Sequence, residues 1–271
     1  MPDGARLRVG IINIMPRAET YEAYLTRPLL ASRWPVEPRW IRLESHSYTS
    51  SDAEHVRRHY STFDQLLAQT SIDGLILTGA PVEELEFEDV RYFSELVGVL
   101  EHVRRRGIGT LGLCWGGMAL AWLVGVPKVR LRQKLFGVFE QRRLDEGHVL
   151  TERFGERFWC AHSRHSGILD AELVRARDAG LVNLLAHGEE AGYTMFESAD
   201  GHFVAHLGHP EYAAERLLDE WQRDSARGRS DVERPRNFDV DHPIASWTSH
   251  CDQLFDNWLT RLGRARSGAG K

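Results

Sequence analysis

Several features are scarce in this sequence, and each scarcity removes a class of protein. Only three of the 271 residues are cysteines (Cys114, Cys160 and Cys251), too few and too scattered for a disulfide framework or a zinc ribbon. No stretch approaches the ~20 apolar residues that a bilayer span needs, and the N-terminus has no signal-peptide core. We therefore expect a cytoplasmic protein in a reducing compartment, where a cysteine is free to act as a nucleophile.

The sequence also lacks an excess of positive charge. Its formal net charge is -5 and its pI is near 6.2, so we expect neither nucleic acid nor an anionic membrane as a partner. Charged residues make up 27% and hydrophobic residues 42% of the chain, enough for a sizeable core. We expect one domain over residues 1–271, with an ordered core of about 7–262 and a flexible tail over 263–271.

Apolar runs alternate with helical patterns through the first half of the chain. Strands are predicted at 7–14, 36–43, 73–81 and 109–113, and helical patterns at 19–30, 53–69 and 87–103. This alternation predicts an α/β fold with a doubly wound, mostly parallel sheet. The less regular second half is predicted to hold a strand pair within 129–144, a hairpin of 193–197 with 202–207, and helices over 211–223 and 244–262.

The stretch TLGLCWGGMALAW, residues 110–122, places Cys114 between a predicted strand and a predicted helix. A nucleophile at such a corner has the elbow geometry of serine hydrolases, and Gly116 and Gly117 let backbone and substrate approach closely. The helix that begins near Trp115 directs its N–H groups toward the sulfur and favours the thiolate. Cys114 is therefore a candidate nucleophile; the alternative is a small buried core residue.

A thiolate nucleophile needs a base, and one of the 13 histidines has a suitable context. In HLGHPEYAAERL, residues 206–217, His209 follows an apolar strand and Glu211 lies two positions further on. On an extended turn both side chains face one direction, so Glu211 can hold and polarise the imidazole. The alternative is that Glu211 only caps the following helix. Together with the cysteine, this segment predicts a Cys–His–Glu triad.

Backbone amides near the nucleophile are candidates for an oxyanion site. The segment LTGAPVE, residues 77–83, leaves a predicted strand through Gly79 and Ala80, whose N–H groups could face the same carbon as the amide of Trp115. An ordinary strand-to-loop turn would contain the same glycine.

These motifs resemble the class I glutamine amidotransferase-like proteins and, more finely, the homoserine O-acyltransferases of methionine biosynthesis. The matching segments keep the family order and are INIMP (12–16), LTGAPVEELEFEDV (77–90), CWGG (114–117), GVPK (125–128), KLFGVFE (134–140), HSRH (162–165), GHPEY (208–212) and SWTSH…LFDNWL (246–259). The resemblance implies a flavodoxin-like fold. It also implies that Cys114 forms an acyl-thioester, that His209 accepts protons and that Glu211 is its partner.

The resemblance gives roles to residues that look ordinary on their own. Lys134, Ser163 and Arg223 match substrate-binding positions, although each by itself reads as a surface charge or a loop residue. Glu83 matches the position that sorts acyl donors, where glutamate accompanies acetyl-CoA and glycine accompanies succinyl-CoA. A carboxylate there repels the succinyl carboxylate and does not oppose a methyl group. The resemblance also implies acetyl-CoA as co-substrate and no permanently bound cofactor or metal. Members of the family commonly form homodimers, and the sequence leaves the oligomeric state open.

We therefore expect transfer of an acetyl group from acetyl-CoA to the hydroxyl of L-homoserine through an acyl-cysteine. Departures from the family pattern, including Arg17-Ala18 after the MP dipeptide and the absence of arginines in IASWTSH, leave L-serine open as acceptor, with an acetyl or succinyl donor. A glutamine amidotransferase would use the same triad, but Met118 stands where it would carry glutamine. A catalytically idle binding module would not need an intact triad.

Overall fold

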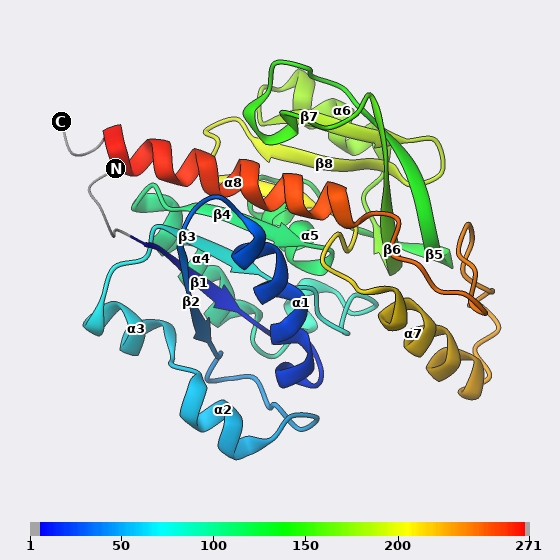
Figure 1. The fold of residues 1–271 in the computed structure, drawn as a ribbon, viewed down its shortest axis with the longest axis horizontal. Coiled ribbons are helices and arrows are strands. Elements are labelled where there is room, and N and C mark those ends of the chain that lie inside the picture. The colour runs from blue at the N-terminus through cyan, green and yellow to red at the C-terminus, as the bar shows by residue number, and fades with distance from the viewer. Residues whose placement is uncertain (1–5, 269–271) are drawn as a thin grey trace.

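The structure is a computed structural model that describes residues 6–268 (Figure 1). Its strands form one mixed sheet in the order β2-β1-β3-β4-β9-β8-β7-β5-β6. The strands are β1 (Leu7–Ile12), β2 (Val36–Ile41), β3 (Gly74–Leu77), β4 (Gly109–Leu113), β5 (Val129–Arg143), β6 (Arg157–Gly167), β7 (Val182–Gly188), β8 (Gly192–Ser198) and β9 (Phe203–His206).

The helices follow the strands in the alternation that the first half of the sequence predicts. They are α1 (Ala18–Ala31), α2 (Ala53–His59), α3 (Phe63–Gln69), α4 (Phe93–Arg105), α5 (Trp115–Leu123), α6 (Asp170–Asp178), α7 (Ala214–Ala226) and α8 (Thr248–Gly268), with short 3-10 turns at Phe87–Asp89 and Val149–Thr151. Within residues 6–268, none of them is both long enough and apolar enough to cross a bilayer.

The sheet has a parallel half and an antiparallel half. Strands β2, β1, β3, β4 and β9 run parallel, as the sequence predicts, and β9, β8, β7, β5 and β6 pair antiparallel. The predicted hairpin of β8 and β9 is confirmed. The strand pair predicted within 129–144 is wrong: this segment is the single long strand β5, whose register shifts between Arg130 and Leu135, and its partner is β6.

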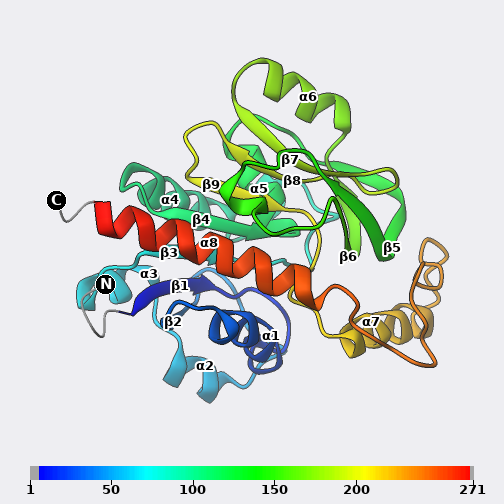
Figure 2. The same cartoon turned by 45° about the horizontal axis from the view of Figure 1, so that its top comes forward.

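Helices cover both faces of the parallel half. In β3, Leu75 and Leu77 belong to the core shared with α4 and α5, whereas Ile76 belongs to the core shared with α1 and α8, as the alternation of strand side chains requires. Figure 2 shows α8 lying across the sheet beside α1, with α4 and α5 behind the strands. The fold class is the predicted α/β class, with helices on both faces of the sheet.

Four predicted helices have other bounds in the structure. The helix predicted over 87–103 begins only at Phe93, because Phe87–Asp89 forms a separate 3-10 turn. The pattern over 53–69 splits into α2 and α3 because Thr62 starts a new helix with a reciprocal capping box to Gln65. The helix predicted over 211–223 begins only at Ala214, which leaves 211–213 as a turn. Helix α8 begins at Thr248 rather than 244. It continues to Gly268, where Arg266 donates to the Arg6 carbonyl, so 263–268 are helical rather than a flexible tail. Residues 269–271 lie outside the described part.

Candidate active site

Cys114 lies where β4 turns into α5, at the carboxyl edge of the parallel strands. Its φ of 50° and ψ of -112° form a conformation that side chains rarely adopt. Two glycines permit the turn: a Cβ on Gly116 would lie 2.5 Å from the Leu77 carbonyl oxygen, and a Cβ on Gly112 would lie 2.6 Å from that of Gly116. The chain therefore has the elbow that the sequence predicts, with the sulfur at the start of a helix.

His209 approaches this corner from the neighbouring strand β9. Its Nδ1 lies 2.8 Å from Oε1 of Glu211, and both side chains are buried. A Cβ added to Gly79 would lie 3.2 Å from Cε1 of His209 and 3.6 Å from Cβ of Cys114, so the imidazole and the thiol flank the same glycine. The structure thus brings Cys114, His209 and Glu211 together.

The charges around His209 favour its protonated form. Burial alone would lower the pKa of His209, but the negative charges of Cys114 and Glu211 outweigh burial and hold that pKa well above its ordinary value. The imidazolium is therefore available beside the sulfur, which is the state that supports a thiolate nucleophile.

Two tyrosines that no sequence motif singled out contact the triad. The hydroxyl of Tyr21, on α1, donates to the same oxygen of Glu211 that contacts His209. The ring of Tyr212 stacks on the His209 imidazole at a centroid distance of 3.9 Å. Since Tyr21 is 190 positions away from Glu211, no local pattern could have revealed the first contact.

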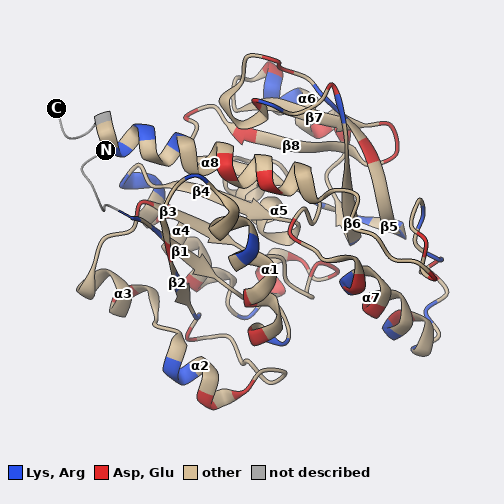
Figure 3. Cartoon of the chain, viewed as in Figure 1, with Lys and Arg blue, Asp and Glu red and all other residues tan. Residues whose placement is uncertain are grey.

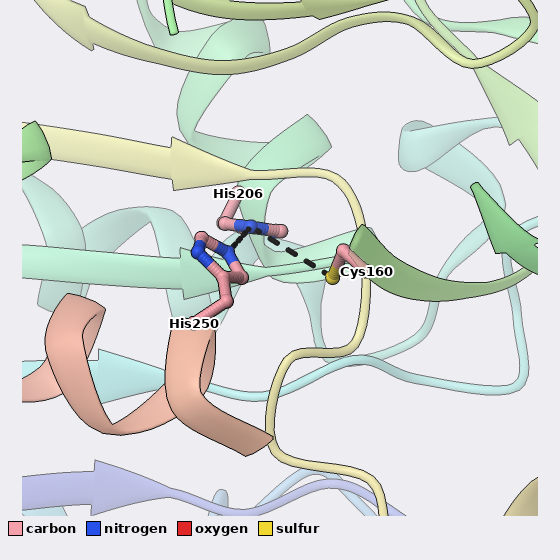
Figure 4. Close-up of side chains that lie close together, drawn as sticks. All are labelled: Cys160, His206 and His250. Carbon is pink, nitrogen blue, oxygen red and sulfur yellow. Dashed lines mark hydrogen bonds between the residues drawn. The ribbon is translucent and has the colours of Figure 1, made fainter. Parts of the chain in front are cut away.

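A separate cluster of buried side chains consists of Cys160, His206 and His250 (Figure 4). Ligand atoms of Cys160, His206 and His250 lie within 4.8 Å of one another, which is close enough to ask whether they could hold a metal. The Gly208 N–H donates to Nδ1 of His206 at 3.1 Å, so the Nε2 of His206 carries a proton and donates to Nε2 of His250, also at 3.1 Å.

This hydrogen-bonding pattern does not suit a metal. Binding through Nε2 of His206 would move its proton to Nδ1, which faces the Gly208 N–H. Burial lowers the pKa of His206 to about 4 and keeps that of His250 well below its ordinary value, so both rings are neutral. The cluster is better described as a support for the loop before His209.

The predicted oxyanion residues lie around the thiol. Gly79 faces both Cys114 and His209, and Ala80 lines the cavity that contains them. Trp115 is the first residue of α5, and N–H groups in the first turn of a helix have no intrahelical acceptor. These amides can therefore serve an oxygen held near the sulfur.

The thiol opens into a cavity of about 150 Å³, which we call the catalytic cavity. It contains the other side chains that the sequence singles out: Glu83, Lys134, Ser163 and Arg223. Lys134, Ser163 and Glu83 are not the solvated surface groups that they resemble in isolation, because all three are buried or largely buried. Arg223 alone is exposed at the rim.

Known proteins match this chain in sequence and in fold. The profile of the homoserine O-succinyltransferase family matches residues 2–264. The chain belongs to this family. Homoserine O-acetyltransferases of Bacillus cereus and Clostridium novyi are each 36% identical over 259 residues, which cover 93% of this chain and 84% of theirs. The family resemblance inferred from the sequence is thereby confirmed, and with it the classification of the chain as an acyltransferase.

Solved structures confirm the wider fold relationship. A glutamine amidotransferase from Thermotoga maritima has a TM-score of 0.62 at 14% identity, covering 95% of this chain and 98% of that one. Another from Methylobacillus flagellatus has a TM-score of 0.61 at 13% identity, covering 94% of each chain. At such low identity the likeness concerns the fold alone, which is the predicted amidotransferase-like one.

In this member of the homoserine O-succinyltransferase family, both predicted substrate-binding cations contact one carboxylate. Lys134 Nζ lies 2.7 Å from Oδ2 of Asp224, and Arg223 Nε lies 2.8 Å from Oδ1 of the same residue. Ser163 donates to Glu220, which also pairs with Arg216 at 2.8 Å. Sequence reasoning missed Asp224, Glu220 and Arg216, although all three lie on the helix that follows the His-Pro-Glu motif.

Glu83 also lines the catalytic cavity, where its side chain is only partly exposed. Its Oε2 has no hydrogen-bond partner within residues 6–268. Burial raises the pKa of Glu83 to about 7, even though the His165 N–H and the charges of Lys134 and His209 act to lower it. The carboxyl group is therefore close to half ionised at neutral pH, rather than fully charged as the sequence argument assumes.

Proposed function

We propose that this enzyme transfers an acetyl group from acetyl-CoA to the side-chain hydroxyl of L-homoserine through an acetyl-Cys114 intermediate. The observation that carries the proposal is the Cys114–His209–Glu211 arrangement at a strand-to-helix elbow, opening into a cavity walled by Glu83. The acetyltransferases that resemble the chain along most of its length support both the donor and the acceptor.

The first half-reaction acylates the enzyme. The thiolate of Cys114 attacks the thioester carbonyl, and the resulting oxyanion lies toward the amides of Gly79, Ala80 and Trp115. When the bond between the acetyl carbon and the coenzyme sulfur breaks, the leaving thiolate takes the proton of the His209 imidazolium. The products are free CoA, acetyl-Cys114 and a neutral imidazole.

The second half-reaction uses that imidazole as a base. His209 takes the proton of the homoserine hydroxyl as its oxygen attacks the acetyl-cysteine, and Cys114 leaves as a thiolate. Glu211, held by Tyr21, keeps Nδ1 of His209 as the donor nitrogen, so that Nε2 is the one that exchanges protons. The imidazolium–thiolate pair is then restored.

The polar wall of the catalytic cavity suits a zwitterionic acceptor. Arg223 offers a planar fork and Lys134 a point charge for the α-carboxylate, while Asp224 between them offers a counter-charge for the α-ammonium. In the free protein Asp224 is paired with both Lys134 and Arg223. The acceptor carboxylate therefore has to replace Asp224 in part of those ion pairs. The same wall would accept L-serine, which is one methylene shorter.

Mass spectrometry of the intact protein tests the proposal. Incubation with acetyl-CoA and no acceptor should add one acetyl group to the wild-type enzyme, and peptide analysis should place it on Cys114. The Cys114→Ser variant should stay unmodified while keeping its thermal unfolding transition, since a hydroxyl lacks the thiolate population. Adding homoserine should remove the acetyl group faster than adding serine. Glutamine hydrolysis without any acetylation would instead identify a glutamine amidotransferase.

A further inference from the structure

A second and larger cavity adjoins the catalytic one. It has a volume of about 790 Å³ and lies between the segment 46–51, the start of α1 and one side of α7. We call it the arginine-lined cavity, after Arg17, Arg216, Arg223 and Arg227 in its wall. The two cavities are continuous at the rim, because seven residues line both: Met15, Pro16, Pro81, Arg216, Glu220, Arg223 and Arg227.

The two cavities differ in volume and therefore suit different parts of the substrates. Pockets for drug-sized ligands and cofactors commonly measure ~300–1,000 Å³. The catalytic cavity, at about 150 Å³, is below that range and suits an acyl group with a small amino acid. The arginine-lined cavity lies within that range and shares its rim with the cavity that contains the thiol. A large thioester donor therefore needs the second cavity for the part that does not react.

Charge distinguishes the arginine-lined cavity from another large hollow of the surface. Its wall holds four arginines against two carboxylates, Asp219 and Glu220. A groove of about 500 Å³ beside β5 holds five cations against five carboxylates and is electrically balanced. Figure 3 shows basic and acidic segments following one another along α7. The excess of positive charge in the cavity therefore depends on which α7 side chains line it.

Not all of the positive charge in the arginine-lined cavity is neutralised by the protein. Arg216 pairs with Glu220 at 2.8 Å, and Arg17 lies 3.6 Å from Asp219 with both side chains half-exposed. Arg227, at the C-terminal end of α7, makes no ion pair and no side-chain hydrogen bond within residues 6–268. An exposed guanidinium with no partner, next to serine and threonine hydroxyls of 47–51, suits phosphate oxygens.

We infer that the arginine-lined cavity binds the phosphate-bearing nucleotide of the acyl-CoA donor, with Arg227 and Arg17 as phosphate contacts. The pantetheine arm then runs along Met15, Pro16 and Pro81 to bring the thioester to Cys114. This inference rests on the proposed function, because it concerns the donor of that reaction. It adds a binding site through which a nucleotide remote from the reacting carbon should raise the rate.

Two donors that differ only in the nucleotide test this inference. Acetyl-CoA carries it and S-acetylpantetheine does not, so the ratio of their kcat/KM values isolates the contribution of the nucleotide. In Arg227→Glu this ratio should fall about tenfold or more, because the variant loses a charge-assisted contact and places a negative charge near the phosphates. Arg17→Glu should lower the ratio in the same direction.

The matched control is Arg132→Glu, the same charge reversal at an exposed arginine of the balanced groove. Its ratio should equal that of the wild type. An unchanged ratio in Arg227→Glu would overturn the inference, and so would an equal fall in Arg132→Glu, because that would indicate general charge steering. If neither donor acetylates Cys114 in the wild type, the proposed function fails and this inference falls with it.

Discussion

Donor selection by Glu83 should depend on pH in a way that the structure quantifies. A charged carboxylate ~4 Å from the succinyl carboxylate, at an effective dielectric of ~20, would be repelled by roughly 4 kcal/mol. Glu83 can escape this repulsion by binding a proton, and with a pKa of about 7 it does so at little cost. That cost is only about 0.4 kcal/mol at pH 7 and about 1.4 kcal/mol at pH 8. Charge alone therefore limits selectivity to about twofold at pH 7 and about tenfold at pH 8.

The sign follows from the raised pKa. Below pH 7 Glu83 is mostly neutral and the succinyl carboxylate meets no like charge, whereas above pH 7 discrimination grows. From pH 6 to pH 8 the neutral fraction of Glu83 falls about tenfold. The ratio of kcat/KM for succinyl-CoA to that for acetyl-CoA should fall about as much. Taking the ratio cancels the titration of His209, which acts on both donors.

Substitutions separate charge from volume. Glu83→Gln keeps the shape and removes the charge, so its donor ratio should not vary with pH. Glu83→Gly also makes room, so its succinyl-CoA use should rise further at every pH. Glu84→Gln is the matched control, because the Glu84 carboxylate is engaged by Arg229 at 2.8 Å and its loss should leave the slope intact. A wild-type ratio that stays flat between pH 6 and pH 8 would refute the electrostatic account and leave only size.

Three further outcomes follow from the contacts. Tyr21→Phe removes the hydroxyl that donates to Glu211 and should lower kcat by about tenfold or more in steady-state assays; an unchanged kcat would show that Glu211 needs no second donor. Gly116→Ala should destabilise the fold by several kcal/mol in urea unfolding, because the new Cβ would lie 2.5 Å from a backbone oxygen. Gly98→Ala is the control: nothing lies within 4 Å of its Cβ in α4, so it should stabilise the fold by ~0.5–1 kcal/mol. His250→Leu should cost ~1–3 kcal/mol by leaving a buried N–H unpaired, and His250→Gln should recover part of that loss; equal losses in both variants would contradict the assigned proton positions.

The sequence predicts the parallel half of the fold well because its strands are short apolar runs that end at glycines and polar turns. Strand β6 has no such signature. Its buried residues include His162 and Arg164, whose polar groups are satisfied by distant partners; Arg164 donates to the carbonyls of Ser166 and Ala191. No local pattern predicts burial of a guanidinium, so β6 could not be read from the sequence, in contrast to the confirmed hairpin of β8 and β9.

The candidate site likewise has a part that the sequence predicts and a part that it does not. Cys114, His209 and Glu211 lie within short motifs whose spacing carries the geometry, and the structure places them together. The contacts of Lys134 with Asp224 span 90 positions, and they depend on how α7 packs over β5. The ionisation of Glu83 likewise depends on burial, which is a property of the folded chain. Family resemblance could identify these positions but not their state.

The order of the elements along the chain has a consequence for synthesis. Strands β4 and β9 are neighbours in the sheet, yet the chain between them forms β5 to β8, so a ribosome releases the thiol well before the imidazole that serves it. Helix α8, which packs Trp258 and Leu262 over Gly74 of β3, emerges last of the described elements. Until then the nascent chain exposes an apolar face that is prone to aggregation. A chain that ends before α8 should therefore be insoluble, and one that ends before β9 should also lack the base that serves Cys114.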